Sequence, residues 1–124
     1  MAKIKDVIER VDSLKPNAFS EEQKVDWLAQ LEGKLAAEVF LINAAGIRNF
    51  RYQYPDDMDT ELLVSFPYDD LYDHWLEAQI DYANGEYDRY QNSTAMYNAS
   101  YESFVTWFLS LYDPAQGYRR DEYV

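Results

Sequence analysis

A long apolar seam constrains this chain more than any other feature of its sequence. Between positions 72 and 111, mostly apolar and aromatic side chains recur at steps of three and four residues. Such spacing places side chains on one face of an α-helix and predicts that this face packs against other helices. The seam consists of Tyr72, Leu76, Ile80, Ala83, Tyr87, Tyr90, Thr94, Tyr97, Tyr101, Phe104, Phe108 and Leu111.

The seam predicts one long C-terminal helix over about 69–112, because its register continues without interruption. At 1.5 Å per residue this helix would be about 65 Å long, longer than a compact domain of this size is wide. Asn84-Gly85 is a weak point, where the helix either bends at Gly85 or breaks into two helices. Since Ala83 and Tyr87 keep the same register, we expect the continuous helix, with the break as the alternative.

Two shorter helices are predicted before the seam. Apolar residues at helical spacing indicate a helix over 4–14, and a longer stripe indicates a second helix over 21–42. Ser20 and Gln23 match a capping box at the start of the second helix.

The segment 47–66 combines period-two alternation with turn residues, which predicts a short β-hairpin or an ordered loop. The last residues, 113–124, are expected to form a loosely ordered tail. The whole chain, 1–124, is therefore predicted to be one mainly α domain, a small helical bundle around its long C-terminal helix.

Negative charge is concentrated in the middle of the chain. The 124 residues carry 23 acidic and 11 basic side chains, for a net charge of −12 at pH 7. Between Tyr52 and Tyr90 there are eleven acids and one base, Arg89, so this segment carries −10. Such a surface repels nucleic-acid phosphates and anionic lipid headgroups, so no tight nucleic-acid binding is expected. The candidate acidic surface comprises Asp56, Asp57, Asp59, Glu61, Asp69, Asp70 and Asp73.

No catalytic or metal-binding constellation is visible. The absence of cysteine excludes disulfides, thiolate zinc sites and cysteine nucleophiles. His74 is the one histidine, which excludes a multi-histidine metal site, and a helix carboxylate such as Asp70 is its expected hydrogen-bond partner. The acids at 56–59 lack the glycine and terminal glutamate of an EF-hand loop. We therefore expect no enzyme, no cofactor, no metal and, from the short apolar stretches, no membrane association.

The second half of the predicted long helix is almost without charge. From Tyr90 to Tyr112 the only charged residue is Glu102. A helix with one side in water normally carries charges there, so this half is expected to be covered on several sides. The alternatives are a core within one chain and an interface between subunits. The candidate interface residues are Tyr87, Tyr90, Tyr97, Tyr101, Phe104, Trp107 and Phe108.

Two stretches resemble small proteins of phages and prophages of Gram-positive bacteria. The first is Val11-Asp12-Ser13-Leu14-Lys15-Pro16-Asn17, followed by Phe19-Ser20 and the run 24–32 with Trp27-Leu28. The second is Pro67-Tyr68-Asp69-Asp70-Leu71-Tyr72, followed by 77–82, 86–92 and 96–101. The resemblance follows the chain as a pattern and contains no catalytic signature.

The resemblance implies a virion structural protein of the head–tail connector or adaptor type. Proteins of that group are small and helical, and they form rings beneath the portal. It further implies non-enzymatic assembly as a homo-oligomer, partners among portal, neck or tail components, and a virion protein made in the bacterial cytoplasm. The residues leave a second class open: an acidic soluble regulator, such as a DNA mimic, that binds a basic protein through positions 56–88.

Overall fold

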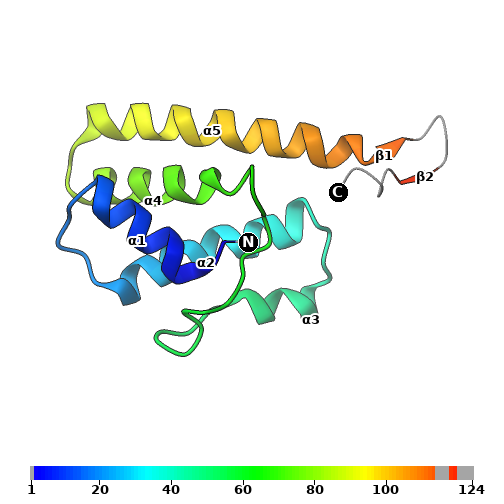
Figure 1. Cartoon of the computed structure of the whole chain (residues 1–124), viewed down its shortest axis with the longest axis horizontal. Helices are drawn as coiled ribbons and strands as arrows, with labels where there is room; N and C mark the ends of the chain where they lie inside the picture. The colour runs from blue at the N-terminus through cyan, green and yellow to red at the C-terminus, as the bar shows by residue number, and fades with distance from the viewer. Residues whose placement is uncertain (1, 114–117, 120–124) are drawn as a thin grey trace.

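The computed structural model describes residues 2–113, 118 and 119, and it shows a helical bundle (Figure 1). The mainly α class and a long C-terminal helix are confirmed. Two-residue strands β1 (Tyr112–Asp113) and β2 (Tyr118–Arg119) pair antiparallel after the last helix. The helices are, in chain order, α1 (Ile4–Leu14), α2 (Glu21–Glu38), α3 (Ala44–Ile47), the 3-10 helix η1 (Arg48–Phe50), α4 (Asp70–Ala83) and α5 (Tyr87–Ser110).

The expectation of one continuous helix over 69–112 is wrong, because α4 and α5 form an antiparallel hairpin (Figure 1). Gly85 adopts a φ of 73°, in the left-handed region that glycine occupies without steric cost. Its amide donates to the carbonyl of Tyr82 at 3.0 Å, and the amide of Glu86 donates to the carbonyl of Asp81 at 2.9 Å. These two bonds are the Schellman pattern, which satisfies the last carbonyls of α4 and ends it.

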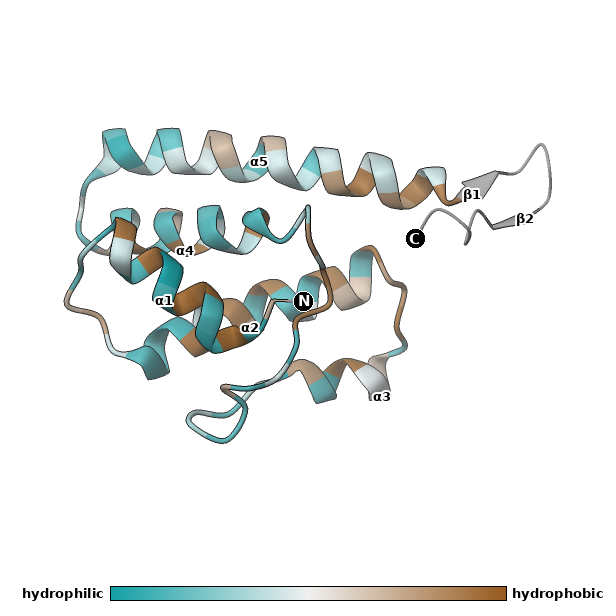
Figure 2. Cartoon of the chain, in the orientation of Figure 1, coloured by the Kyte–Doolittle hydropathy of each residue, from teal (hydrophilic) through white to brown (hydrophobic). Residues whose placement is uncertain are grey.

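The apolar register survives the break because most of each half of the seam is covered within the folded chain, apart from Ala83 and Tyr87 beside the turn. Tyr72, Leu76 and Ile80 of α4 are buried, as are Phe104 of α5 and Leu111 directly after it. Hydrophobic residues of α1 and α2 gather where these helices pack together (Figure 2). A hairpin therefore buries apolar surface that a single 65 Å helix of the same sequence would leave exposed.

The first half of the chain follows its predictions closely. Helix α1 has the predicted bounds, and α2 begins where predicted, with the Ser20 hydroxyl accepting a hydrogen bond from the Gln23 amide at 3.1 Å. Helix α2 ends at Glu38, four residues earlier than predicted. Leu41 has a φ of 55°, and the Asn43 side chain accepts from the Gly46 amide at 2.9 Å, which caps α3.

Of the two alternatives for 47–66, the ordered loop is correct. Its first residues belong to α3 and η1, and the rest crosses the bundle without a hairpin among the described residues. The loop is ordered by the N-terminal residues: the Leu62 amide donates to the Ala2 carbonyl at 2.9 Å, and the Ile4 amide donates to the Thr60 carbonyl at 3.1 Å. In the predicted tail, 114–117 and 120–124 lie outside the described residues.

A buried carboxylate ties this loop to the bundle. Glu32 of α2 is fully buried, and its Oε2 accepts hydrogen bonds from the Tyr52 hydroxyl at 2.8 Å and the Leu63 amide at 3.0 Å. Its Oε1 accepts from the Tyr72 hydroxyl at 2.7 Å, and that hydroxyl in turn accepts from the Val64 amide at 2.9 Å. Burial raises the pKa of Glu32 above its ordinary value, while the three hydrogen bonds act to lower it.

We expect wild type and Glu32→Gln to differ in stability in a pH-dependent way. Because the folded-state pKa of Glu32 is raised, proton uptake favours folding. This contribution is fully present below the ordinary pKa and is lost as the pH rises through the folded-state pKa. The free energy of unfolding of wild type, minus that of the variant, should increase as the pH falls from about 7 to about 4.5 in urea titrations. A constant or shrinking difference would contradict the assignment.

Two glycines give opposite expectations for substitution by alanine. Gly85→Ala should destabilise the chain by about 1 kcal/mol, because a Cβ is strained at positive φ. Gly33→Ala should stabilise it by up to about 1 kcal/mol, because Gly33 lies inside α2 and a Cβ there meets no atom within 4 Å. Chemical unfolding of both variants measures these changes, and an equal effect of the two would show that the α4–α5 turn is misassigned.

Candidate functional site

Helix α5 has one packed face and one exposed face. Among the seven candidate interface aromatics, Phe104 is buried in the core, and Tyr97, Tyr101, Trp107 and Phe108 pack against that core. These five side chains therefore complete the bundle of their own chain.

The other two candidate aromatics lie near the α4–α5 turn. Tyr90 is half-buried, and its ring centroid lies 5.2 Å from that of Tyr82. Tyr87 is 60% exposed. Because the described chain covers only one side of α5, the expectation of cover on several sides within the chain is not met.

From Asn92 to Ser110, the exposed face of α5 carries uncharged residues, with Glu102 as its one charge. The Met96 side chain is 54% exposed. We call this surface the outer face of α5; its exposed residues include Asn92, Ala95, Met96, Asn98, Ala99, Glu102, Ser103, Thr106, Leu109 and Ser110. Sequence periodicity marked the aromatic face instead, since the apolar stripe of a helix is the more visible signal.

Two shallow hollows border the outer face of α5. One, of about 290 Å³, lies between Pro67-Tyr68 and the α5 residues Ala99 and Ser103. The other, of about 650 Å³, continues along α5 past Trp107. The Tyr68 ring stacks on Trp107 with centroids 5.0 Å apart. The stacked rings of Tyr68 and Trp107, next to the small side chains of Ala99 and Ser103, form a rigid surface of the kind that anchors protein interfaces.

Much of the candidate acidic surface is engaged with the chain's own cations. The Arg10 guanidinium donates to both carboxylate oxygens of Asp73, at 2.6 and 3.1 Å, and lies 3.7 Å from Asp69. Lys5 pairs with Asp59 at 2.7 Å. The Arg10 contacts hold α4 against α1, whereas the Lys5–Asp59 pair lies at the surface, where ion pairs add little stability.

The remaining four acids of that surface are not equivalent. Asp57 accepts a hydrogen bond from the Gln53 amide at 2.6 Å, and Asp70 accepts from the Ser100 hydroxyl at 3.2 Å. Asp56 and Glu61 are exposed, and their carboxylates form no ion pair within the part of the chain that the structure describes. The structure thus does not gather the seven acids into one free patch.

A buried ion pair joins three helices. Asp81 of α4 is fully buried, receives the Lys15 ammonium at 2.6 Å and accepts a hydrogen bond from the Ser93 hydroxyl of α5 at 2.7 Å. The pair holds the end of α1 and the first half of α5 against the last turn of α4. Asp81 entered the sequence analysis only as one of the eleven acids between Tyr52 and Tyr90, and its burial depends on tertiary contacts that periodicity does not reveal.

His74 has the helix-carboxylate neighbours that its sequence context suggests. Its Nδ1 lies 3.1 Å from Oε1 of Glu77, and its Nε2 lies 3.9 Å from Asp70. Within residues 2–113, 118 and 119, no three ligating side chains converge on a point where a metal ion would fit. Among the described helices, none combines the length and apolar character needed to cross a membrane.

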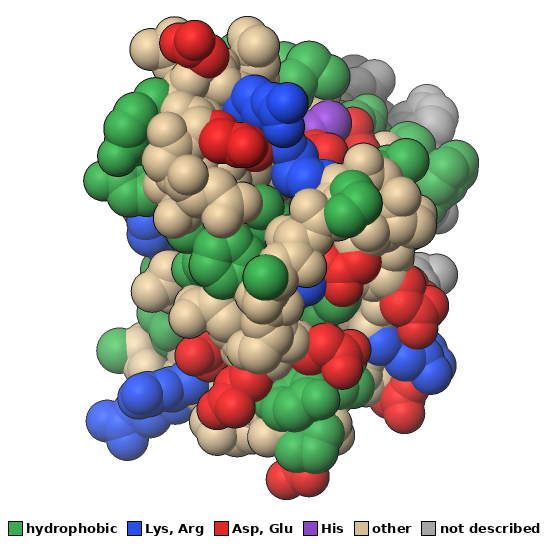
Figure 3. Space-filling view, turned by 90° about the vertical axis from the view of Figure 1, so that its left-hand side faces the viewer, with side chains coloured by type: hydrophobic (Ala, Val, Ile, Leu, Met, Phe, Trp, Pro, Cys, Tyr) green, Lys and Arg blue, Asp and Glu red, His purple; other side chains and the backbone are tan. Residues whose placement is uncertain are grey.

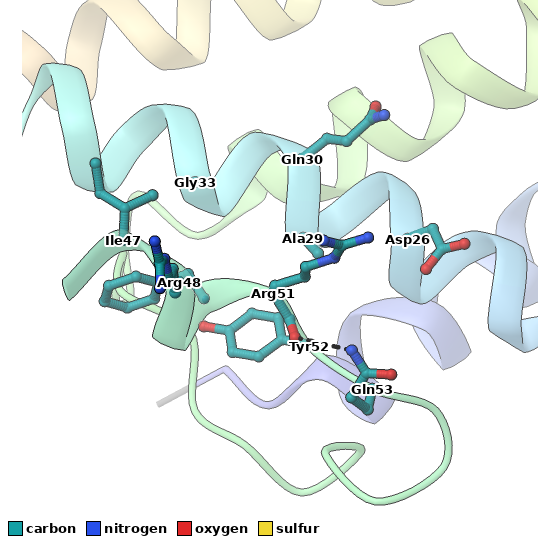
Figure 4. A pocket seen from close by; sticks show the side chains of 10 residues that line it. Asp26, Ala29, Gln30, Gly33, Ile47, Arg48, Arg51, Tyr52 and Gln53 are labelled. Atoms are coloured by element: carbon teal, nitrogen blue, oxygen red, sulfur yellow. Dashed lines mark hydrogen bonds between the residues drawn. The ribbon is translucent and has the colours of Figure 1, made fainter. Parts of the chain in front are cut away.

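A hollow of about 590 Å³ opens between α2 and the segment 47–53 (Figure 4). Arg51 extends along α2 toward Ala29 and Asp26 (Figure 4). Arg48 and Arg51 form no ion pair with any described residue, in contrast to Lys5, Arg10 and Lys15. The other lining residues are Gln30, Gly33, Ile47, Phe50, Tyr52 and Gln53.

Sequence reasoning missed this hollow. Its signal was the pair Arg48 and Arg51, three positions apart in an otherwise acidic chain, but α3 and η1 are too short to be predicted from periodicity. No protein-family model, curated protein or solved structure matches the chain.

Two aspartates provide a matched test of which acids are structural. Asp81→Asn should destabilise the chain by about 3 kcal/mol, because it removes the carboxylate of a buried ion pair. Asp59→Asn removes an ion pair of nearly equal length, 2.7 Å, in which both side chains are exposed, and should leave the unfolding midpoint unchanged. Urea unfolding at neutral pH measures both. Equal effects would contradict the distinction between buried and surface pairs.

Proposed function

We propose that the chain is a non-enzymatic structural protein of a phage or prophage particle, a head–tail connector or adaptor subunit. Its role is to bind other virion proteins, among portal, neck or tail components, and further copies of itself. It is made in the bacterial cytoplasm and becomes part of the virion. The sequence resemblance supplies this class of function, and the outer face of α5 is the observation that supports an assembly role.

The outer face of α5 suits a protein partner for an electrostatic reason. Covering a charged surface requires removal of water from ions, which is costly unless each ion finds a partner. Over the 24 residues of α5, about 36 Å of helix, the exposed side chains of the second half include one charge, Glu102. A partner can therefore cover this face at low desolvation cost, next to the Tyr68–Trp107 stack.

The alternative, an acidic regulator or DNA mimic, has less support from the geometry. A mimic of DNA needs a regular array of free carboxylates to replace phosphates. In this chain, Asp59, Asp69 and Asp73 pair with Lys5 and Arg10. Asp81 is buried as well. We therefore favour assembly over charge mimicry.

Substitution on the outer face of α5 tests this proposal. The tagged chain is co-expressed with the portal, neck and tail-completion proteins encoded in the same genome and recovered by affinity purification. Wild type should retain at least one of them. Ala99→Arg places a charge at the centre of the outer face and should reduce that retention about tenfold, equivalent to about 1.4 kcal/mol.

Ala18→Arg is the matched control, because Ala18 is also exposed but lies in the α1–α2 loop. It should retain the partner as wild type does. Recovery of none of these virion proteins by wild type, or equal retention by Ala99→Arg and wild type, would contradict the proposed function.

A further inference from the structure

We propose that copies of this chain bind each other head to tail, with an exposed aromatic end of one copy seated in the hollow beside Arg48 and Arg51 of the next. This inference rests on the proposed assembly role and specifies the contact between copies. The two surfaces are different parts of the chain, and they complement each other in polarity and charge.

The first surface lies where the α4–α5 turn meets the end of α1. Tyr82 and Tyr87 are 59% and 60% exposed, and their ring centroids are 5.9 Å apart in an edge-to-face arrangement. Leu14 is 76% exposed and belongs to the same region, because the adjacent Lys15 bonds to Asp81 next to Tyr82. We call Leu14, Tyr82 and Tyr87 the aromatic end. Figure 3 looks onto this side of the molecule, where hydrophobic side chains lie at the surface among acidic and basic ones.

Acidic side chains flank the aromatic end. Glu86 and Asp88 stand on either side of Tyr87 and are exposed. Glu86 lies 3.4 Å from Arg89 in an exposed pair, and Asp88 has no ion-pair partner among the described residues. Such exposed pairs are weak and exchange readily. The aromatic end therefore presents apolar rings with available carboxylates beside them.

The second surface is the hollow between α2 and the segment 47–53. Its volume, about 590 Å³, is within the range of cavities that enclose ligands larger than a single aromatic ring. Ala29, Ile47 and Phe50 give it apolar walls. Its charged lining is two arginines, Arg48 and Arg51, and one acid, Asp26, with no ion pair formed between them, so the hollow is positive on balance. A guanidinium group both stacks on an aromatic ring and pairs with a carboxylate. These two arginines therefore match a tyrosine ring with an acid next to it.

Gly33 lines the hollow, so a side chain at this position would project into it. A glycine inside a helix costs about 1 kcal/mol relative to alanine, yet no neighbouring atom excludes a Cβ at this position. Neither the backbone conformation nor the packing of the single chain thus requires glycine at position 33. A partner side chain that approaches the α2 backbone closely would require it, because a Cβ would then be in the way.

Charge complementarity favours a second copy as the occupant. The chain carries −12, so copies repel one another over most approaches. An approach that sets Glu86 and Asp88 against Arg48 and Arg51 is attractive instead. The α4–α5 turn lies at one end of the bundle (Figure 1). Helix α3 lies away from this turn, on the side of α2 that faces away from α4 and α5 (Figure 1). A contact between two different surfaces is heterologous, and it generates a closed ring or a continuing filament.

Two variants that each disable one surface test the proposal. Arg48→Glu/Arg51→Glu reverses the charge of the hollow, and Tyr82→Ser/Tyr87→Ser removes the rings of the aromatic end. Sedimentation velocity of purified full chains between about 10 and 500 µM measures association. Wild type should associate with increasing concentration, and less so at high salt. Each variant alone should remain monomeric, with a thermal midpoint near that of wild type.

Mixing the two variants is the decisive step. Each retains the surface that the other lacks, so the mixture should form 1:1 dimers and nothing larger. Gly33→Leu places a side chain in the hollow without changing its charge. Alone it should remain monomeric, as Arg48→Glu/Arg51→Glu does. Mixed with Tyr82→Ser/Tyr87→Ser it should form 1:1 dimers. A monomeric wild type across the concentration range, a mixture that stays monomeric, or association of either double variant alone would overturn the proposal.

The mixing experiment and the co-purification experiment can fail independently of each other. If the mixture stays monomeric while Ala99→Arg still loses the portal, neck or tail component, the head-to-tail contact is wrong and the assembly role stands. If the mixture dimerises but wild type recovers no virion protein, the contact between copies stands and the phage assignment is wrong.

Discussion

The buried carboxylate of Glu32 is the interaction on which the arrangement of the surfaces depends. It binds two tyrosine hydroxyls and the Leu63 amide, and through Tyr72 it also orders the Val64 amide. Without it, these buried donors would lose their acceptor, at a cost of about 1–3 kcal/mol for each group. The segment it holds begins after η1, which forms the arginine hollow, and leads to Tyr68, which borders α5. One polar cluster therefore orders the segment that connects the arginine hollow to the hollows beside the outer face of α5.

Ion pairs within the chain determine which charged side chains remain available at the surface. The acids between Tyr52 and Tyr90 fasten the chain to itself where Lys5, Arg10 and Lys15 approach them. That leaves two unusual surfaces in a chain of net charge −12: the nearly neutral outer face of α5 and the hollow with unpaired Arg48 and Arg51. A protein partner can cover the outer face of α5 at low electrostatic cost, and it can cover the hollow if it brings carboxylates to the two arginines. We therefore interpret this fold as an assembly unit.

The sequence predicted local features well and tertiary ones poorly. The bounds of α1, the Ser20 cap and the mainly α class follow from periodicity and capping chemistry, which act over a few residues. The seam in 72–111 was identified correctly, but its register is equally compatible with a hairpin, and Gly85 was the only signal that favoured the break. The burial of Asp81 arises from contacts between distant segments, so no local pattern marked it. The arginine hollow had only the spacing of Arg48 and Arg51 as a signal, and its shape depends on how η1 packs against α2.

The central claim is that the outer face of α5 becomes covered when the protein joins a particle. Hydroxyl-radical footprinting of Met96 tests it most directly, because this side chain is 54% exposed in the single chain and methionine is readily oxidised. Half-buried Met58, in the ordered loop away from α5, serves as the internal reference. The account predicts rapid oxidation of Met96 in the isolated protein and strong protection, relative to Met58, in the assembled particle. Equal oxidation of Met96 in both states would contradict it.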